Sequence, residues 1–232
     1  MARILIESSR LLSEACARDL EERARAAMAA RGRFSLALPG GSVAESFLPA
    51  LARAAIDWAR VDLFFGDERA VPPDHADSNF AQAKRLLLDH VAARVHRIRG
   101  EAEDLAAEAA RAERELLDAL GGEAVLDVAL LGVGPDGHVC SLFPGHAALR
   151  EEARLLSVVL DSPKPPPRRL TLTLRALRAA RVVVVAAFGA AKAEAIEAAV
   201  ADPDSRLPAG LVLRQARDAW LFLDPPAAAR LS

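Results

Sequence analysis

Short, fully apolar segments alternate along the chain with segments whose apolar residues recur at helical spacing. An alternating Leu/Thr pattern from Leu170 to Leu174 predicts a further strand, preceded by Arg168 and Arg169. The apolar strand predictions are Phe34 to Leu38, Val61 to Phe65, Leu126 to Leu131, Arg181 to Phe188 and Ala219 to Leu223. The predicted helices are Leu11 to Ala30, Val43 to Ala54, Ser78 to His90, Glu103 to Leu120 and Ala190 to Ala201.

Strands that are apolar at every position are covered on both faces, and their alternation with helices predicts a mostly parallel sheet. We therefore expect a three-layer α/β/α sandwich and a single domain over residues 1–232. The proline-rich run from Ser162 to Pro167 is too short for an interdomain linker. It is interpreted as a surface loop, and Pro163 to Pro167 within it is the place to look for closure over a substrate.

Composition limits the partners of the chain. Its 232 residues are 52% hydrophobic and 27% charged, with a formal net charge of -2. This charge provides no global attraction for nucleic acid or an anionic membrane. The N-terminus lacks an apolar signal core, and Cys16 and Cys140 are interpreted as reduced thiols, so we expect a cytoplasmic protein.

The first candidate site loop follows the strand prediction Phe34 to Leu38. In a parallel sheet, ligands bind beyond the carboxyl ends of the strands. Gly40 and Gly41 allow close approach of an anion, and Ser42 offers a hydroxyl at a helix start. This pattern is typical of a phosphate cradle, and equally of a tight turn in which Ser42 caps the helix.

Three charged residues follow the next strand. Arg69 could bind phosphate or stabilise a developing oxyanion, and Asp67 could bind a sugar hydroxyl or carry a proton. An isolated charged triplet is more often a solvated, salt-bridged loop. Further along, Asp77 to Asn79 is typical of a helix N-cap that could also reach the site, and capping is the favoured interpretation for Asp77 and Ser78.

The loop from Gly132 to His138 contains the principal candidate base. His138 could accept a proton from water, and Asp136 could orient it or share its charge. The alternative is a structural histidine, which the position at a strand end in a glycine-rich loop disfavours. The loop also matches G-x-G-x-x-G, but Pro135 interrupts the turn and no second strand supplies a ribose-binding acid, so a dinucleotide site is disfavoured.

Lys192 is expected early in a helix, where a cation opposes the helix dipole unless an anion binds nearby. The alternative is an ordinary exposed lysine. The sequence contains neither a G-x-S-x-G nucleophile elbow nor a recognisable set of metal-binding histidines. We therefore expect neither a cofactor nor a metal.

Taken together, these loops resemble the 6-phosphogluconolactonase family, within a superfamily that includes glucosamine-6-phosphate isomerase. Small departures are Pro39, Val43 with Ala44, and Cys140, of which Val43 removes one possible hydroxyl from the phosphate loop. The matching blocks are Leu38 to Ser42, Phe65 to Arg69 with Asp77 to Asn79, Gly132 to His138 with Ser141 to Gly145, Arg169 to Thr173, and Gly189 to Lys192.

The resemblance implies a Rossmann-like fold and hydrolysis of a phosphorylated sugar lactone in the pentose phosphate pathway. His138 would be the general base held by Asp136, with Asp67 and Arg69 at the sugar end. The phosphate would be bound by Gly40, Gly41 and Ser42, together with Arg169 and Lys192.

Three rival functions are weighed against the lactonase. The isomerases carry an additional acid shortly after the loop histidine, whereas this chain has Ser141 to Pro144 without a carboxylate. A sugar-phosphate sensor would carry a basic DNA-binding helical appendage, which the sequence lacks. A nicotinamide-dependent oxidoreductase is disfavoured with the dinucleotide site. We expect a monomer, because no dimerisation stripe is evident.

Overall fold

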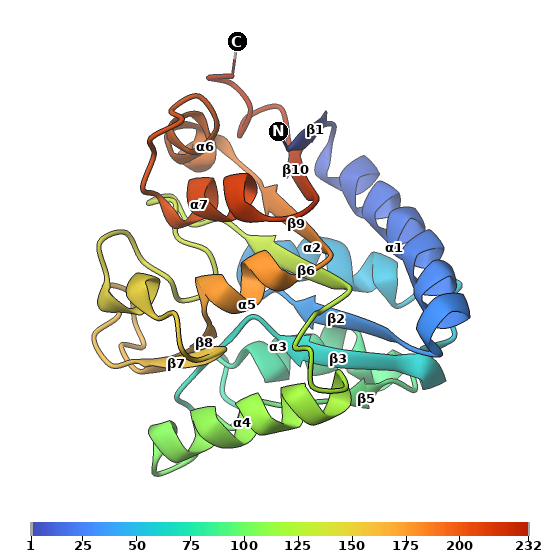
Figure 1. Ribbon diagram of the computed structural model, residues 1–232. Helices are drawn as coiled ribbons and strands as arrows, with labels where there is room; N and C mark the ends of the chain where they lie inside the picture. Colours follow the sequence, from blue (N-terminus) through green and yellow to red (C-terminus); the bar gives the residue numbers. More distant parts are fainter. Residues whose placement is uncertain (1, 232) are drawn as a thin grey trace.

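The predicted apolar strands form the centre of a parallel sheet in the computed structural model, which describes residues 2–231 (Figure 1). The strand order is β1-β10-β9-β6-β2-β3-β5, and every neighbouring pair is parallel. The strands of this sheet are β1 (Arg3–Ile6), β2 (Phe34–Leu38), β3 (Val61–Phe65), β5 (Arg94–Val95), β6 (Val128–Gly132), β9 (Val182–Ala187) and β10 (Ala219–Leu223).

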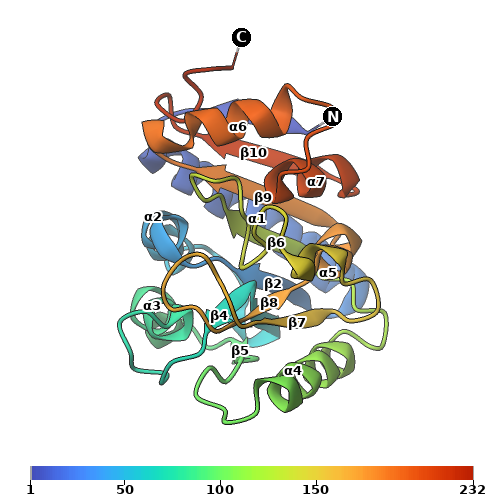
Figure 2. The same cartoon turned by 90° about the vertical axis from the view of Figure 1, so that its left-hand side faces the viewer.

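Helices cover both faces of the sheet. Figure 2 shows α2 and α3 on one side, and α4, α5 and α7 on the other. This arrangement confirms the three-layer, Rossmann-like α/β/α prediction. The helices are α1 (Ser9–Arg31), α2 (Gly41–Leu51), α3 (Asn79–Leu86), α4 (Leu105–Ala119), α5 (Leu174–Ala179), α6 (Ala193–Val200) and α7 (Pro208–Gln215).

The predicted elements match the observed ones closely where the apolar pattern continues over many residues. Helix α1 ends at Gly32, which adopts a left-handed φ of 82° as a helix C-cap. The segment from Ala190 to Ala201 is divided into a 3₁₀ turn, Ala190–Lys192, and helix α6. The strand predicted to end at Leu174 stops at Leu172, because Thr173 caps α5 with its side chain.

A second, antiparallel sheet was not predicted. It has the order β4-β8-β7, formed by β4 (Asp67–Arg69), β8 (Arg169–Leu172) and β7 (Leu156–Val159). The interpretation of the charged triplet after β3 as a solvated loop is therefore wrong. Glu68 is buried because its carboxylate accepts hydrogen bonds from the Asn79 and Phe80 amides at the start of α3.

The chain order reverses between β6 and β2, which are neighbours in the sheet. From β2 the chain proceeds to β3 and β5 on one side, whereas β6, β9 and β10 lie on the other. The loops that leave β6 and β2 separate at this switch point and open a crevice at the carboxyl edge. No helix within residues 2–231 has the length and apolarity needed to span a membrane.

Candidate active site

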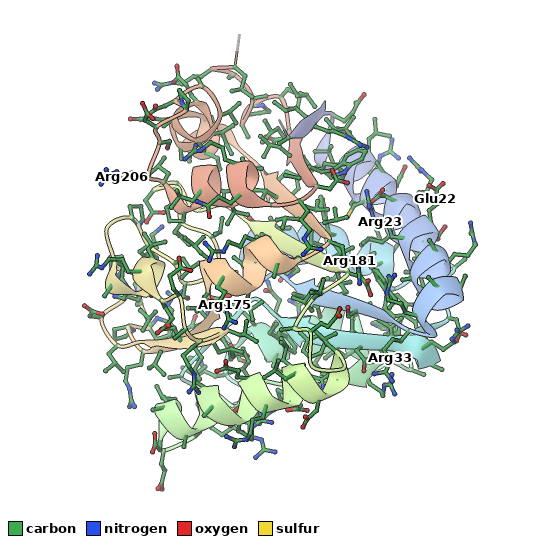
Figure 3. All side chains as sticks on the ribbon, viewed as in Figure 1. Glu22, Arg23, Arg33, Arg175, Arg181 and Arg206 are labelled. Atoms are coloured by element: carbon green, nitrogen blue, oxygen red, sulfur yellow. The ribbon has the colours of Figure 1, made fainter. Side chains whose placement is uncertain are left out.

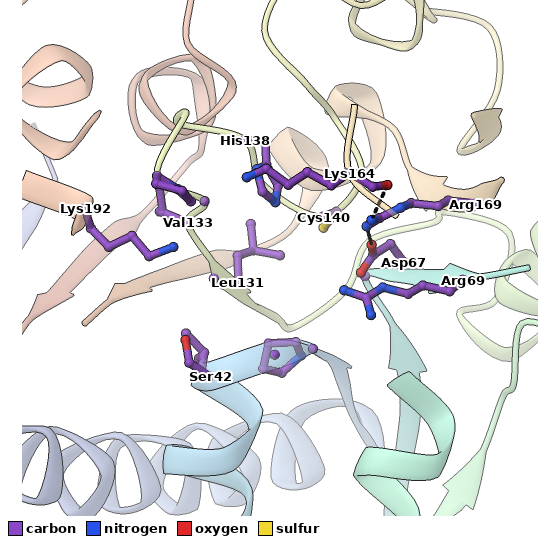
Figure 4. A pocket seen from close by; sticks show the side chains of 18 of the residues that line it. Ser42, Asp67, Arg69, Leu131, Val133, His138, Cys140, Lys164, Arg169 and Lys192 are labelled. Carbon is purple, nitrogen blue, oxygen red and sulfur yellow. Dashed lines mark hydrogen bonds and ion pairs between the residues drawn. The ribbon is translucent and has the colours of Figure 1, made fainter. Parts of the chain in front are cut away.

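A cavity of about 290 Å³ opens at the switch point (Figure 4). Its walls are the loops that follow β2, β3, β6 and β9, together with the proline-rich loop before β8. All the predicted site residues except Asp136 line it, and Asp136 contacts the cavity through His138. The lining residues from the prediction are Gly40, Gly41, Ser42, Asp67, Arg69, His138, Arg169 and Lys192.

The glycine loop after β2 is shaped by close backbone approach. A Cβ atom on Gly40 would lie 2.1 Å from Oδ1 of Asn79, and Gly41 has a φ of +65°. Gly40, and not Ser42, occupies the N-cap position of α2, without a side-chain cap. Ser42 is exposed, so its hydroxyl remains available to a ligand in the cavity.

The first turn of α2 supplies amides as well. The Gly41 N–H donates to Oε1 of Gln82 at 2.9 Å, which removes it from the set of amides open to an anion. Ser42 and Val43 follow it in the first turn, where N–H groups lack helical carbonyl partners. The helix start therefore favours an anion through Ser42 and the positive end of the helix dipole.

Asp67 is fixed by two side chains whose roles the sequence did not assign. Nδ2 of Asn79 donates to Oδ1 of Asp67 at 2.9 Å, and Oγ of Ser141 donates to Oδ2 at 2.6 Å. All three residues are buried. Asn79 and Ser141 lie within the sequence blocks that carry the family resemblance, and Asn79 also belongs to the helix-start segment expected to reach the site. Ser78 caps α3 as predicted, whereas Asp77 contributes its backbone carbonyl to Arg69.

Arg69 points from β4 toward the cavity (Figure 4). Its Nη1 donates to the Asp77 carbonyl at 2.8 Å. Its Nε is buried and forms no hydrogen bond within the described part of the chain. Because a buried guanidinium N–H without a partner is unfavourable, Arg69 retains capacity to bind an anionic group in the cavity.

His138 and Asp136 form a hydrogen-bonded pair. Nδ1 of His138 lies 2.5 Å from Oδ1 of Asp136. An ionised carboxylate only accepts hydrogen bonds, so Nδ1 carries the proton and Nε2 keeps its lone pair. The ring packs against Phe143 with centroids 4.7 Å apart. Gly134 lies directly beside the ring, because a Cβ atom there would be 1.9 Å from Nδ1.

Burial and charge set the protonation states of this pair. Burial lowers the pKa of His138; the Asp136 hydrogen bond and charge raise it, and the Lys164 charge lowers it again, for a net decrease. Burial raises the pKa of Asp136, but the hydrogen bonds from His138 and Lys164 and the His138 charge outweigh it and lower that pKa to about 2. A neutral imidazole beside an ionised carboxylate is the state that a general base requires.

Lys164 is a further site residue to which the sequence analysis assigned no role. It belongs to the proline-rich loop, lines the cavity, and places Nζ 3.0 Å from Oδ1 of Asp136. Only its position in the segment Pro163 to Pro167, where the sequence analysis looked for loop closure, hinted at a role.

Arg169 and Lys192 lie on opposite sides of the cavity (Figure 4). Lys192 is on the same side as Ser42, and burial and the Lys164 charge lower its pKa, with Asp136 opposing. Arg169 donates to the carbonyls of Lys164, Pro165 and Pro166 at 3.0–3.1 Å. Both residues thus line the same cavity as the glycine loop, with Arg169 bound to the proline-rich loop.

The loop after β6 favours neither a dinucleotide site nor a cysteine nucleophile. The G-x-G-x-x-G loop does not enter a helix; it forms short bridges, Val133 with Val139 and Val139 with Leu142. It therefore lacks the helix N-terminus that receives a dinucleotide pyrophosphate. Burial and the Asp67 charge raise the pKa of Cys140 well above its usual value, so its thiol is protonated and a poor nucleophile.

A cavity at the switch point of a parallel sheet, with a His–Asp pair among several cations, defines an α/β enzyme for a small anionic substrate. The model of the glucosamine-6-phosphate isomerases/6-phosphogluconolactonase family matches residues 7–221. The chain belongs to this family.

Relatives of known name cover nearly the whole chain. It is 42% identical to a 6-phosphogluconolactonase from Mycobacterium tuberculosis, covering 98% of this chain and 97% of that protein. It is 40% identical to a human 6-phosphogluconolactonase, covering 98% and 92%. The solved structure of 6-phosphogluconolactonase from Trypanosoma brucei is 31% identical, with a TM-score of 0.85 over 100% of this chain and 99% of that one.

Proposed function

We propose that this protein hydrolyses 6-phospho-D-glucono-1,5-lactone to 6-phospho-D-gluconate, as a carboxylic ester hydrolase of the pentose phosphate pathway. The observation that carries the proposal is the His138–Asp136 pair, whose Nε2 is available to a water in a cation-lined cavity. The proposal is further supported by relatives at about 40% identity that are named 6-phosphogluconolactonase.

The reaction needs water attack, oxyanion stabilisation and protonation of the leaving oxygen. Nε2 of His138 takes a proton from water while the water oxygen bonds to C1 of the lactone. The imidazolium is stabilised by Asp136 through the Nδ1 hydrogen bond. When the bond from C1 to the ring oxygen breaks, the same imidazolium returns the proton to that oxygen, which leaves an open-chain acid.

The two sides of the cavity divide the remaining tasks. Lys192, Ser42 and the glycine loop of Gly40 and Gly41 bind the phosphate, which anchors C1 near His138. Arg69, whose Nε lacks a partner among the described residues, stabilises the oxyanion at C1. Asp67, held by Asn79 and Ser141, positions the sugar end.

The phosphate role predicted for Arg169 stays a prediction. Its hydrogen bonds to the carbonyls of Lys164 and Pro165 support a role in holding the proline-rich loop, and its Nη1 lies 4.0 Å from Oδ2 of Asp67. A cytoplasmic location is also proposed, supported by the free thiols of Cys16 and Cys140.

The deciding experiment compares two substrates. Freshly generated 6-phosphogluconolactone is offered to the purified protein with EDTA, and hydrolysis is measured above the spontaneous rate. Glucosamine 6-phosphate is assayed in parallel for ammonia release. A large lactonase rate that survives EDTA, without deamination, supports the proposal. Deamination alone would indicate the isomerase activity, and binding of sugar phosphate without turnover of either would indicate a sensor.

A further inference from the structure

Lys164 reaches the catalytic pair from a different part of the chain. It lies between β7 and β8, and its side chain is about one-third exposed. Nζ lies 3.0 Å from Oδ1 of Asp136 and 3.3 Å from Nδ1 of His138. Figure 4 shows the side chain extending past the His138 ring at the cavity wall.

The backbone of Lys164 is firmly held. Its carbonyl accepts hydrogen bonds from Nη2 of Arg169 at 3.1 Å and from Oγ of Ser162 at 2.9 Å, and its N–H is 3.2 Å from that Oγ. Arg169 is only 3% exposed and also lies over the Phe143 ring, against which His138 packs. Lys164 therefore approaches the pair from a fixed anchor.

The contact with Asp136 has a chemical consequence. Oδ1 of Asp136 receives both the Nδ1–H of His138 and an N–H of Lys164. Lys164 thus competes for the oxygen that stabilises an imidazolium, and its own charge lies beside the ring. Both effects favour the neutral imidazole over the imidazolium.

Other charged groups face the ring as well. Asp67 on β4 favours the imidazolium, in the same sense as Asp136. Arg69, Arg169 and Lys192 line the rest of the cavity. Lys164 has the shortest contact with the pair among these cations, so it is the cation whose removal should change His138 most.

We propose that Lys164 is a positioning residue that fixes Asp136 and keeps His138 as the neutral imidazole able to accept the proton of water. This inference rests on the proposed function for its catalytic meaning. It also implies that the His138 imidazolium formed during turnover returns its proton more easily. The imidazolium lies beside a like charge and therefore passes its proton readily to the oxygen of the lactone ring.

The test uses three variants. Lys164→Met removes the cation with little change of length, whereas Lys164→Arg retains it. Lys84→Met is the control for loss of one positive charge, because Lys84 is exposed and pairs with Asp89 away from the cavity. His138 is titrated by NMR in each protein, and its signal is identified by its loss in His138→Gln.

In Lys164→Met we expect the pKa of His138 to rise by about half a unit to one unit. In Lys164→Arg and Lys84→Met it should stay at the wild-type value. An unchanged or lower pKa of His138 in Lys164→Met would overturn the inference. This readout needs no turnover, so it is independent of the proposed lactonase activity.

The pH profile of kcat/KM tests the catalytic meaning. The acidic limb should move to higher pH in Lys164→Met by the same amount as the pKa, and return in Lys164→Arg. A lower plateau with an unmoved limb would mean that Lys164 only anchors the loop, and would contradict the inference. Absence of lactone turnover in the wild type would instead contradict the proposed function.

Discussion

At the scale of single residues, two histidines show what distinguishes a candidate base from a structural group. His96 lies between Asp62 and Glu115, with both ring nitrogens hydrogen-bonded at 2.9 and 3.0 Å, and stacks on Phe64. His138 uses only Nδ1 within residues 2–231 and faces a cavity. The unoccupied nitrogen, and not the burial, gives His138 a chemical role.

At the same scale, Lys192→Met tests the proposed phosphate-binding side of the cavity. Loss of a charge-assisted contact to phosphate, worth about 1.5–3 kcal/mol, should raise KM by about 10- to 150-fold. kcat should change much less, because we propose that Lys192 binds the phosphate, away from C1. Steady-state kinetics beside the Lys84→Met control provide the measurement. A fall in kcat at constant KM would place Lys192 at the reacting centre instead.

The sequence predicted most of the candidate site at this scale, because chemistry-bearing residues follow strand ends. His138, Asp136 and Lys192 were all found in this way. Lys164 was not, because its loop precedes a strand and is held at the cavity by long-range contacts such as those from Arg169 to its carbonyls. Such long-range contacts leave no periodic signal in the sequence.

At the scale of elements, a buried carboxylate, that of Asp127, links β2 to β6 at the amino ends of these strands. The ladder between β2 and β6 is short, with Leu36 opposite Val128 and Ala37 opposite Ala129. Asp127 extends it, because Oδ2 accepts from the Ser35 amide at 2.9 Å and from its hydroxyl at 3.0 Å. Figure 3 shows Arg181 near this edge, and its Nε lies 3.2 Å from Oδ1 of Asp127.

Asp127→Ala should therefore lower stability without changing catalysis. Removal of the carboxylate leaves the buried Ser35 amide unpaired, at a cost of about 2 kcal/mol in the free energy of unfolding. Urea denaturation measures this, with Asp118→Ala as the control on an exposed aspartate of the same surface. An unchanged unfolding midpoint, or a large loss of kcat in the folded variant, would argue against this assignment.

Among the elements that the sequence missed, β4 and β5 are very short. β4 has only three residues, all charged, and pairs with β8 through contacts that no local pattern encodes. β5 has two residues. By contrast, the apolar strands β2, β3 and β10 were predicted with their observed bounds, because burial on both faces requires a continuous apolar run.

At the scale of the whole molecule, the edges of the sheet bear on the oligomeric state. β1 forms one edge and exposes Ile4 and Ile6, at 45% and 46%. It is only four residues long, and the guanidinium of Arg3 lies over the Trp220 ring. Short edge strands flanked by charge disfavour edge-to-edge pairing.

We accordingly predict a monomer in solution. Light scattering coupled to size exclusion should give a mass close to 24.7 kDa over a range of concentrations. A mass near twice that value would contradict the prediction. Loss of the dimer on Ile4→Lys substitution would then assign the interface to β1.

We propose that the His138–Asp136 pair at the switch point opens the lactone without a metal ion. The most direct test is the rate of 6-phosphogluconolactone hydrolysis by His138→Gln beside the wild type, in EDTA and with His90→Ala as the control. We predict that kcat falls by about 10²- to 10⁴-fold in His138→Gln while KM and the unfolding midpoint stay close to wild type. A near-normal kcat in this variant would contradict the account, because His138 could not then be the base.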